Sequence, residues 1–526
     1  MKVTGKMLIG GACIFGTAGT VRAFDPTLGM QIDPPFGAAT TEDVNHACIL
    51  ADEAYDSYRS TSPEIRSAFL DSIADNLLEL DDALYERAAA ETGLTRARLK
   101  SEAGRTAAQL RMFADVVRQG RWRQATIDSA DAARKPLPRV DLRMQKISIG
   151  PVGVFGASNF PILYSVAGGD TASALAAGCP VIVKAHGSHL GTSELVGRAI
   201  QKAVKDSGLH EGVFSLLIGA GNETGESLVD HPLIKAVGFT GSEGGGMALV
   251  RRGAQRAEPI PVFAEMTSVN PNFVLPGALK ARASDIAARF VDQMTSGVGQ
   301  MCLKPGMILA IERDGFDDLR SALSTALAQK SPETMLSPGI SEHFARAAER
   351  TRTGHEIVSI SKGPSPEKQY DGQSEIFELS GEALLADPKL AQEMFGPAGV
   401  LVRCASVEQL VALAASFQGQ LTMSLHTEPP DHEVAKLLIP ILERKTNRIL
   451  FNKFANQVEI GFATIHGGPY PATSDSRFTS VGATAIDRFL RPVCYENMPS
   501  DLLPLALQDS NPLSLWRVTD GTLSFN

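Results

Sequence analysis

Apolar residues recur at intervals of three and four along residues 41–119, which is the spacing of an amphipathic helix. The series includes Ile65, Ala68, Phe69, Ile73, Leu77 and Leu80, whose side chains would share one helix face. Thr41-Glu-Asp-Val begins the region with a residue type that caps helices. From about residue 121 to 144 the chain is basic and loop-like instead. We therefore expect a helical region followed by an irregular segment.

Beyond residue 150, short apolar runs alternate with segments that have a helical pattern. The runs typical of buried strands are Val152–Phe155, Cys179–Val183, Val213–Ile218 and Val237–Thr240, and the helical segments are Ser165–Ala177 and Thr192–Ser207. This alternation predicts a parallel, doubly wound sheet. A second α/β unit is expected to include Asn272–Pro276, Met307–Ile311 and Gly399–Val402. Phe489–Tyr495 has the pattern of an edge strand that needs a partner.

The length and the charge of the chain limit its number of domains and the classes of partner that it can bind. A chain of 526 residues fits two or three domains of α/β type. The net charge is −9 and no block of basic residues occurs, so nucleic-acid binding is not expected, because it needs clustered cations. A small anionic substrate remains compatible, since it needs only one or two cations. No apolar stretch approaches the roughly 20 residues of a membrane span, and we expect no membrane partner.

The cysteines indicate a reducing compartment. They are scattered, with no pair at metal-ligand spacing, at positions 13, 48, 179, 302, 404 and 494. We therefore expect free thiols in the cytoplasm and neither a disulfide scaffold nor a metal site. Lys2 and Lys6 precede the apolar run Met7–Phe15, which imitates a signal peptide. Because two glycines interrupt that run and Thr17–Phe24 reads as a partner strand, we favour a structural strand pair over export.

Cys302 is the strongest candidate for a reactive residue. It lies in Ser296-Gly-Val-Gly-Gln-Met-Cys-Leu-Lys-Pro-Gly306, where glycines let backbone and substrate approach the sulfur closely. A thiolate attacks an aldehyde carbon readily, and the resulting thiohemiacetal can lose a hydride. A small buried thiol is the commoner role of a single cysteine, so the other candidates decide between the two interpretations.

Asn159 and Glu265 could assist such a thiol. Asn159 follows a predicted strand in Gly156-Ala-Ser-Asn-Phe-Pro161, and its side-chain amide could donate to an oxyanion, although asparagine is also a common turn residue. Glu265 ends the apolar run Pro261-Val-Phe-Ala-Glu265. Burial there should raise its pKa toward the range of a general base. The alternative for Glu265 is a carboxylate in an ordinary ion pair.

Three further segments suit a nucleotide cofactor. Lys184 ends a predicted parallel strand, where α/β sheets bind ligands, and could contact ribose hydroxyls or an adenosine phosphate; a solvated lysine is the alternative. Phe239-Thr-Gly-Ser-Glu-Gly-Gly-Gly246 runs from a strand into a helix, so its amides and Ser242 could hold a pyrophosphate. Glu393 precedes a turn and could bind the nicotinamide ribose, with Phe395 packing nearby. Taken singly, the glycine-rich loop is just as readily an ordinary connection, and the Glu393 motif is more readily a mere turn.

Together these motifs resemble the aldehyde dehydrogenase superfamily from about residue 5 to the C-terminus. The resemblance implies Cys302 as nucleophile, Glu265 as general base and Asn159 as oxyanion donor. It also implies that NAD or NADP contacts a set of residues comprising Phe155, Lys184, His186, Gly187, Gly241, Ser242, Gly246, Glu393 and Phe395. The reaction would oxidise an aldehyde to an acid through a thiohemiacetal and a thioester.

The resemblance also implies a domain plan. Residues 1–120 and 145–266 would form the cofactor-binding domain and residues 267–480 the catalytic domain. Residues 121–144 and 481–526 would form a small bridging β arm and a C-terminal tail. Because that arm pairs between subunits in the family, we expect a homo-oligomer, either a dimer or a tetramer.

The chain departs from the common family pattern in two places. Where most members read Glu-Leu-Gly-Gly-Lys, this chain reads Glu265-Met-Thr-Ser-Val-Asn-Pro271. Where most have a carboxylate three residues after the lysine, this chain has Gly187. A carboxylate there would repel the 2′-phosphate of NADP, whereas glycine leaves room, and Lys184 and His186 add donors. We therefore expect NADP to be used well, with NAD as the alternative.

A subgroup resemblance narrows the substrate. Thr192-Ser-Glu-Leu195, the run His466–Arg477 and the ending Arg491-Pro-Val-Cys-Tyr-Glu-Asn497 are similar to 2-oxoglutarate semialdehyde (2,5-dioxovalerate) dehydrogenases. Enzymes of that subgroup act in bacterial breakdown of sugar acids, pentoses or hydroxyproline. A related NADP-linked fatty aldehyde dehydrogenase group shares the Lys-x-His element and is the alternative.

Three questions stay open at this stage. Transfer of the thioester to coenzyme A would use the same thiol, although Glu265 argues for hydrolysis. A non-catalytic protein on this fold would be expected to have lost the thiol or the base. Arg289 could recognise a distal carboxylate, but a solvated helix face is its more ordinary role.

Overall fold

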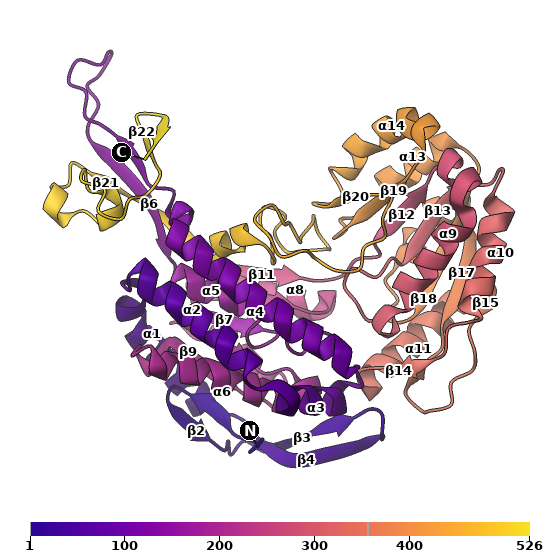
Figure 1. Ribbon diagram of the computed structural model, residues 1–526, viewed down its shortest axis with the longest axis horizontal. Coiled ribbons are helices and arrows are strands. Elements are labelled where there is room, and N and C mark those ends of the chain that lie inside the picture. The colour runs from indigo at the N-terminus through magenta and orange to yellow at the C-terminus, as the bar shows by residue number, and fades with distance from the viewer. Residues whose placement is uncertain (1, 355–356, 526) are drawn as a thin grey trace.

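The helical pattern of residues 41–119 forms four consecutive helices. The computed structural model describes residues 2–354 and 357–525, and α1 to α4 span Thr41–Arg59, Pro63–Leu78, Asp81–Thr92 and Arg96–Gln119. α1 begins with a capping box in which Thr40 and Asp43 satisfy each other's backbone N–H groups. Gly93 and Gly120 end α3 and α4 in the left-handed conformation. In Figure 1 α2, α3 and α4 lie together over one face of the first sheet.

The first sheet has the order β11-β10-β7-β8-β9-β1-β2. Its parallel strands are β7 (Val152–Phe155), β8 (Val181–Lys184), β9 (Phe214–Leu217), β10 (Ala236–Thr240) and β11 (Val262–Glu265). They are joined through α5 (Gly169–Ala177), α6 (Leu190–Asp206), α7 (Glu223–Asp230) and α8 (Glu243–Gln255). Phe155 lies beside Lys184 and Thr240 beside Glu265. The carboxyl ends of four strands therefore meet at one edge, where α/β sheets bind ligands.

The N-terminal strand pair differs from the prediction. β1 (Met7–Ile9) turns at Gly10 and Gly11 and pairs with β2 (Ala12–Ile14), while β1 also pairs with β9 of the sheet. The glycines that interrupt the apolar run thus form the turn of a hairpin within it. β3 (Thr20–Asp25) pairs instead with β4 (Met30–Gly37) in a separate ribbon. The expected pairing of Met7–Phe15 with Thr17–Phe24 was therefore wrong.

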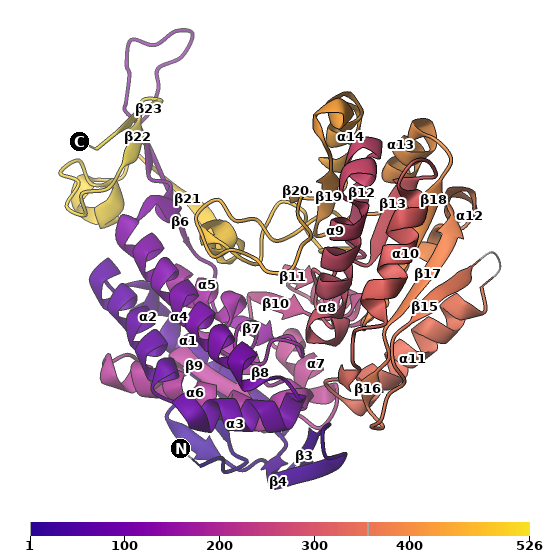
Figure 2. The same cartoon turned by 45° about the vertical axis from the view of Figure 1, so that its right-hand side comes forward.

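The second sheet has the order β15-β17-β18-β13-β12-β19-β20 and forms a separate lobe (Figures 1 and 2). Its strands are β12 (Pro271–Val274), β13 (Met307–Ile311), β15 (Val358–Lys362), β17 (Glu375–Ser380), β18 (Ala398–Cys404), β19 (Met423–His426) and β20 (Ile449–Phe451). Only β15 pairs antiparallel among the pairs of this sheet. Its helices include α9 (Pro276–Thr295), α10 (Phe316–Leu327), α11 (Pro338–Arg352), α12 (Gly381–Ala386), α13 (Val407–Ser416) and α14 (His432–Leu442), and the short strands β14 (Glu333–Thr334) and β16 (Asp371–Gly372) pair beside it.

The basic segment and the C-terminal strand form the arm. β5 (Thr126–Asp128), β6 (Leu142–Ser148), β21 (Leu490–Glu496), β22 (Arg517–Thr519) and β23 (Thr522–Ser524) make a five-stranded sheet in the order β21-β6-β5-β22-β23. It projects from the first lobe in Figure 2. β21 thus finds β6 as the partner that its sequence pattern required. None of the helices in the described part of the chain is long and apolar enough to cross a membrane.

The segment after β20 returns from the second lobe to the first. Thr473 forms a bridge with Glu265, Met266 N donates to Ala472 O at 2.8 Å, and Ser474 N donates to Ala264 O at 2.9 Å. In Figure 1 this segment runs between the two lobes. Residues within the range 267–480 therefore complete the edge of the first sheet.

Candidate active site

Cys302 lies in a tight loop between α9 and β13. Gly297, Val298 and Gly299 all have positive φ, a conformation that is costly for a β-branched residue. A Cβ on Gly299 would lie 2.2 Å from the carbonyl oxygen of Gly396. The Asn270 amide donates to the Cys302 carbonyl at 2.8 Å. The close backbone approach predicted from the glycines is present, and the loop is held firmly beside the 393–398 turn.

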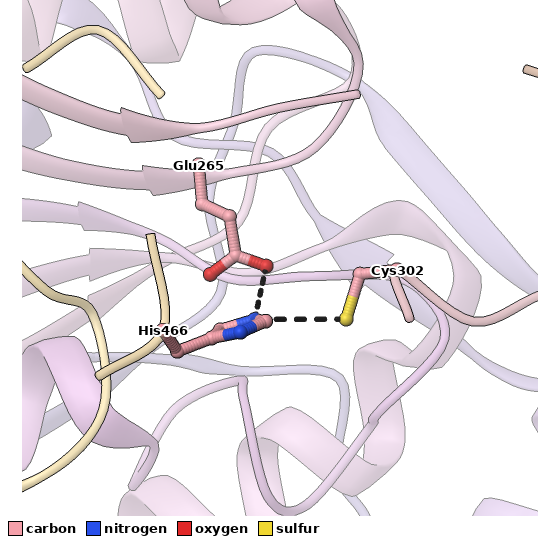
Figure 3. Close-up of side chains that lie close together, drawn as sticks. All are labelled: Glu265, Cys302 and His466. Atoms are coloured by element: carbon pink, nitrogen blue, oxygen red, sulfur yellow. Dashed lines mark hydrogen bonds and ion pairs between the residues drawn. The ribbon is translucent and has the colours of Figure 1, made fainter. Parts of the chain in front are cut away.

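Glu265 and His466 face the sulfur of Cys302 (Figure 3). His466 Nε2 lies 3.8 Å from Cys302 Sγ and 2.8 Å from Glu265 Oε1. Ser480 Oγ donates to the other carboxylate oxygen at 2.6 Å. The thiol sulfur, one imidazole nitrogen and one carboxylate oxygen all lie within 4.8 Å of one another. The structure therefore brings together two predicted residues, Cys302 and Glu265, and one that was not predicted, His466.

The protonation of this group differs from the expectation. Burial alone would raise the pKa of Glu265, but His466 and Ser480 stabilise the carboxylate and bring its pKa below the ordinary value. The predicted rise was wrong because the sequence does not reveal these partners. For Cys302, burial raises the pKa of the thiol well above its ordinary value, and the negative charges of Glu265 and Glu393 add to the rise. The resting thiol is therefore neutral.

His466 reaches the Glu265 carboxylate through its Nε2. Its Nδ1 is buried and makes no hydrogen bond with the residues that the structure describes. A protonated Nδ1 left without an acceptor would carry the penalty of a buried unpaired donor. The tautomer with its proton on Nε2 avoids that penalty and donates to Glu265. His466 thus orients the carboxylate beside the thiol.

Asn159 follows β7 and is 6% exposed. Its Nδ2 donates one hydrogen bond to the carbonyl of Gln300 at 2.9 Å, two residues before the nucleophile. Arg98 donates to the Asn159 carbonyl at 2.7 Å and fixes its backbone. An asparagine amide has two N–H groups, so a second one is available to an oxyanion formed at Cys302.

The cofactor edge lies at the end of β8. The ammonium of Lys184 has no hydrogen bond or ion pair with any residue in the described ranges, and burial lowers its pKa. A Cβ built on Gly187 would have no atom within 4 Å, so the space beside residue 187 is open. His186 Nδ1 accepts from Ser188 N at 3.1 Å, which leaves its Nε2 to donate. These residues fit an adenosine ribose or its phosphate.

His186 contributes a neutral donor to this edge. Its pKa is lowered to about 3, mainly by burial and in smaller part by the neighbouring His189 and Lys184. It stacks against His189 with ring centroids 5.4 Å apart. Any help that His186 gives to a phosphate is therefore a hydrogen bond, whereas Lys184 supplies the charge.

The glycine-rich loop leads into α8. Ser242 caps this helix by accepting from Gly245 N at 3.2 Å. The first amides of the helix have no intrahelical acceptor, and such a helix start suits a phosphate. Phe239 would contact a Cβ on Gly241 at 2.7 Å, and Met266 one on Gly246 at 2.8 Å. Gly246 thus lets α8 pack closely on β11, and its contact with a cofactor stays a prediction.

Glu393 is tied to the loop that departs from the family pattern. Thr267, in the loop between β11 and β12, donates from Oγ1 to Glu393 Oε2 at 2.5 Å and holds this carboxylate in place. Lys304 is buried, and its ammonium donates to the carbonyls of Met394 and Ala398, both at 2.7 Å. Burial lowers the pKa of Lys304 to about 8, while Glu393 opposes this effect. Both residues fix the turn that carries Glu393 and Phe395.

Sequence reasoning missed His466, Thr267 and Lys304. Thr267 and Lys304 stand in motifs already singled out, and each is a polar residue among apolar or small neighbours. The signal for His466 was its place in the run His466-Gly-Gly-Pro-Tyr-Pro, which served only as a subgroup mark. Arg289, by contrast, is 60% exposed and pairs with Asp285 at 3.0 Å, as a solvated helix face requires. Phe155 ends β7 beside Lys184, at the expected edge.

Comparison with known proteins agrees with this geometry. The model of the aldehyde dehydrogenase family matches residues 16–438. The chain is 52% identical over 522 residues to alpha-ketoglutaric semialdehyde dehydrogenase 2 of Azospirillum brasilense, covering 99% of both chains. It is 44% identical over 523 residues to the alpha-ketoglutaric semialdehyde dehydrogenase of Acinetobacter baylyi, again covering 99% of both.

Solved structures give the same fold at low sequence identity. An aldehyde dehydrogenase of Pseudomonas syringae, solved with NAD+ and octanal, superposes with a TM-score of 0.79 at 18% identity, covering 94% of this chain and 98% of that one. A betaine aldehyde dehydrogenase of Staphylococcus aureus, solved with NAD+, gives 0.80 at 18% identity and covers 94% and 96%. The predicted α/β fold of this type is confirmed. The thiol, carboxylate and imidazole at the sheet edge, together with the family match and two relatives above 40% identity, show that the chain belongs to the aldehyde dehydrogenase family.

Proposed function

We propose that this aldehyde dehydrogenase oxidises 2-oxoglutarate semialdehyde (2,5-dioxopentanoate) to 2-oxoglutarate with NADP. The observation that carries the substrate is the 52% identity, over nearly the whole of both chains, to the Azospirillum brasilense protein named for that activity. The reaction type is supported by the buried Cys302, Glu265 and His466. The role belongs to the breakdown of sugar acids or related compounds in the cytoplasm.

The chemistry begins at Cys302. Glu265 accepts the thiol proton, and the sulfur attacks the aldehyde carbon to form a thiohemiacetal. Because the resting thiol has a raised pKa, proton removal accompanies the attack, with little thiolate formed beforehand. The free N–H of Asn159 donates to the oxyanion. NADP, when bound, supplies the acceptor for the hydride that converts this adduct to a thioester.

Glu265 acts a second time in releasing the acid. After the thiol proton has passed to solvent, its carboxylate takes a proton from water, the water oxygen attacks the thioester carbon, and the C–S bond breaks to release the acid and the Cys302 thiolate. His466 and Ser480 hold the two carboxylate oxygens, so the base is oriented and kept ionised. Hydrolysis by this oriented base is favoured over transfer to coenzyme A.

The cofactor would lie along the edge formed by β7, β8 and β10. Lys184 and His186 would hold the adenosine ribose and its 2′-phosphate, with room provided by Gly187. Gly241, Ser242 and the first turn of α8, which includes Gly246, would face the pyrophosphate. Glu393 would accept hydrogen bonds from the nicotinamide ribose, and Phe155 and Phe395 would pack beside the cofactor.

The two lobes and the arm suggest a role for each part of the chain. We propose that the lobe of the first sheet (residues 1–120 and 145–266) binds the cofactor and that residues 267–480 form the catalytic domain. Residues 121–144 and 481–526 would pair with a second subunit in a dimer or tetramer. The five-stranded arm supports this, because β21 leaves an unpaired edge on the sheet.

Initial rates of NADP and NAD reduction test the proposal. 2-Oxoglutarate semialdehyde is compared with succinate semialdehyde and hexanal. A kcat/KM at least about tenfold higher for the dioxo acid, or roughly 1.4 kcal/mol of discrimination, is the expected result. Equal or faster oxidation of hexanal would contradict the substrate and favour a fatty or broad-range aldehyde dehydrogenase.

A further inference from the structure

A cavity of about 360 Å³ lies between α4 and the segment that follows β20. Three cationic side chains line it, Arg105 from α4 and Arg448 and Lys453 from either side of β20, together with one carboxylate, Glu459. The remaining lining includes the apolar Met112 and Val458. The cavity therefore combines an excess of positive charge with an apolar wall, which suits a short carbon chain that ends in an anion.

Among the residues that the structure describes, neither arginine nor Lys453 forms an ion pair. Arg105 Nη2 donates to the Val458 carbonyl at 2.6 Å, and Arg448 Nη2 donates to that of Gln457 at 3.3 Å. Arg448 Nη1 is buried and makes no hydrogen bond within the described chain. Arg448 is half-buried, so its guanidinium gives up part of its hydration without gaining a counterion among the described residues, and burial lowers its pKa.

The cavity shares a wall with the nucleophile. Val458 belongs to an apolar cluster that also contains Leu303, and Tyr164 and Cys302 pack against this cluster. The Tyr164 hydroxyl is buried and makes no hydrogen bond among the described residues. Burial raises the pKa of Tyr164, Arg105 opposes that effect, and Cys302 adds to it. Tyr164 thus lies within electrostatic reach of both the cavity and the thiol.

We propose that Arg105 and Arg448, with Lys453 at the rim, form the subsite that binds the carboxylate of the aldehyde substrate while its carbonyl lies at Cys302. The proposal rests on the proposed function, because it names the groups that read the anionic end of 2-oxoglutarate semialdehyde. Guanidinium groups suit this task, since they bind carboxylates through paired N–H donors. The Tyr164 hydroxyl is placed to donate to the 2-oxo group between the two ends.

The test compares two aldehydes on the variants Arg448→Met and Arg105→Met. Each variant is assayed with 2-oxoglutarate semialdehyde and with pentanal, which has the same number of carbons and no charge. The kcat/KM for the dioxo acid should fall by tenfold or more, mainly through KM, while that for pentanal changes less than threefold. Arg448→Lys should restore part of the loss. Glutarate, a competitive carboxylate probe, should inhibit the wild type and inhibit Arg448→Met more weakly.

Arg111→Met is the matched control. Arg111 lies on α4 like Arg105, but it is exposed and pairs with Asp75 at 2.7 Å. Its replacement should leave both aldehydes unchanged. If the wild type prefers the dioxo acid and the variants keep that preference, the subsite is overturned and the proposed function stays intact.

Two other outcomes also decide the matter. Equal losses on both aldehydes would overturn the subsite, because the arginines would then serve only to hold the fold. A wild type without any preference for the anionic aldehyde would overturn the proposed substrate itself, and glutarate inhibition that was unaffected by Arg448→Met would overturn the subsite separately.

Discussion

The catalytic centre and the cofactor edge meet at the carboxyl end of the first sheet and are built in opposite ways. At the centre, Glu265 already receives hydrogen bonds from His466 and Ser480, and Asn159 is held by its neighbours. At the edge, the Lys184 ammonium has no hydrogen bond or ion pair in the described chain, and the space where a side chain at position 187 would lie is open. Reacting groups are thus oriented before any ligand arrives, whereas binding groups are left for the ligand to satisfy.

This difference separates two kinds of effect. A change at the centre removes an orientation that the protein supplies, so it should lower kcat for every aldehyde. A change at the edge alters only the binding free energy of one cofactor relative to the other, so it should change the ratio of kcat/KM for NADP to that for NAD. The variants below use that contrast.

Cys302→Ala should give the largest effect. Without the sulfur no covalent intermediate forms, and turnover should fall by roughly 10⁴-fold or more with either cofactor. The rate of NADPH formation with 2-oxoglutarate semialdehyde measures it. Cys404→Ala, which removes a buried thiol in β18, should keep activity; normal turnover by Cys302→Ala would refute the mechanism.

Glu265→Gln should come next. Glutamine keeps the size of the side chain but cannot accept a proton, so kcat should fall by about 10²–10⁴-fold, the contribution typical of a general base. Steady-state rates with NADP and with NAD should fall equally. A loss confined to one cofactor would move Glu265 from the centre to the edge and break the comparison.

His466→Gln should have a smaller effect on the rate, about 10²-fold or less, and a distinct effect on pH dependence. His466 lowers the pKa of Glu265, so its removal should raise that pKa. The base is then protonated at higher pH, and the acid limb of the kcat/KM profile should move upward in pH. An unchanged limb would mean that His466 does not act on Glu265.

Gly187→Glu should have the smallest effect, confined to the cofactor. A carboxylate near Lys184 would repel a 2′-phosphate, so kcat/KM for NADP relative to NAD should fall by roughly tenfold, or about 1.4 kcal/mol. Gly339→Glu, at a glycine of α11 that also has open space, should leave the ratio unchanged. Equal effects on both cofactors would count against the assignment of the edge.

Local sequence pattern was enough to predict the sheet strands named here and the family. β7, β8, β10 and the thiol loop stand in short segments whose apolar runs and glycines are visible in the sequence, and these segments gave Cys302, Glu265 and Asn159. Where the chain folds back on itself, local pattern failed. His466 lies 201 residues from Glu265 and reaches it only because the segment after β20 returns to the first lobe.

The same cause explains the wrong pKa direction for Glu265. Burial was predictable from its apolar neighbours, but the stabilising donors come from distant residues. The N-terminal hairpin failed for a different reason, because Gly10 and Gly11 were read as breaks in a run when they form its turn.

The most direct test of the account measures the Cys302 thiol in the free enzyme. Its alkylation by iodoacetamide is followed at the Cys302 peptide by mass spectrometry across pH, in the wild type and in Glu265→Gln. We expect a neutral thiol, so the wild-type midpoint should lie above the ordinary value of about 8.5. Because the charge of Glu265 contributes to that rise, Glu265→Gln should shift the midpoint to lower pH while turnover collapses. A wild-type midpoint near or below neutrality, moving upward in Glu265→Gln, would contradict the account.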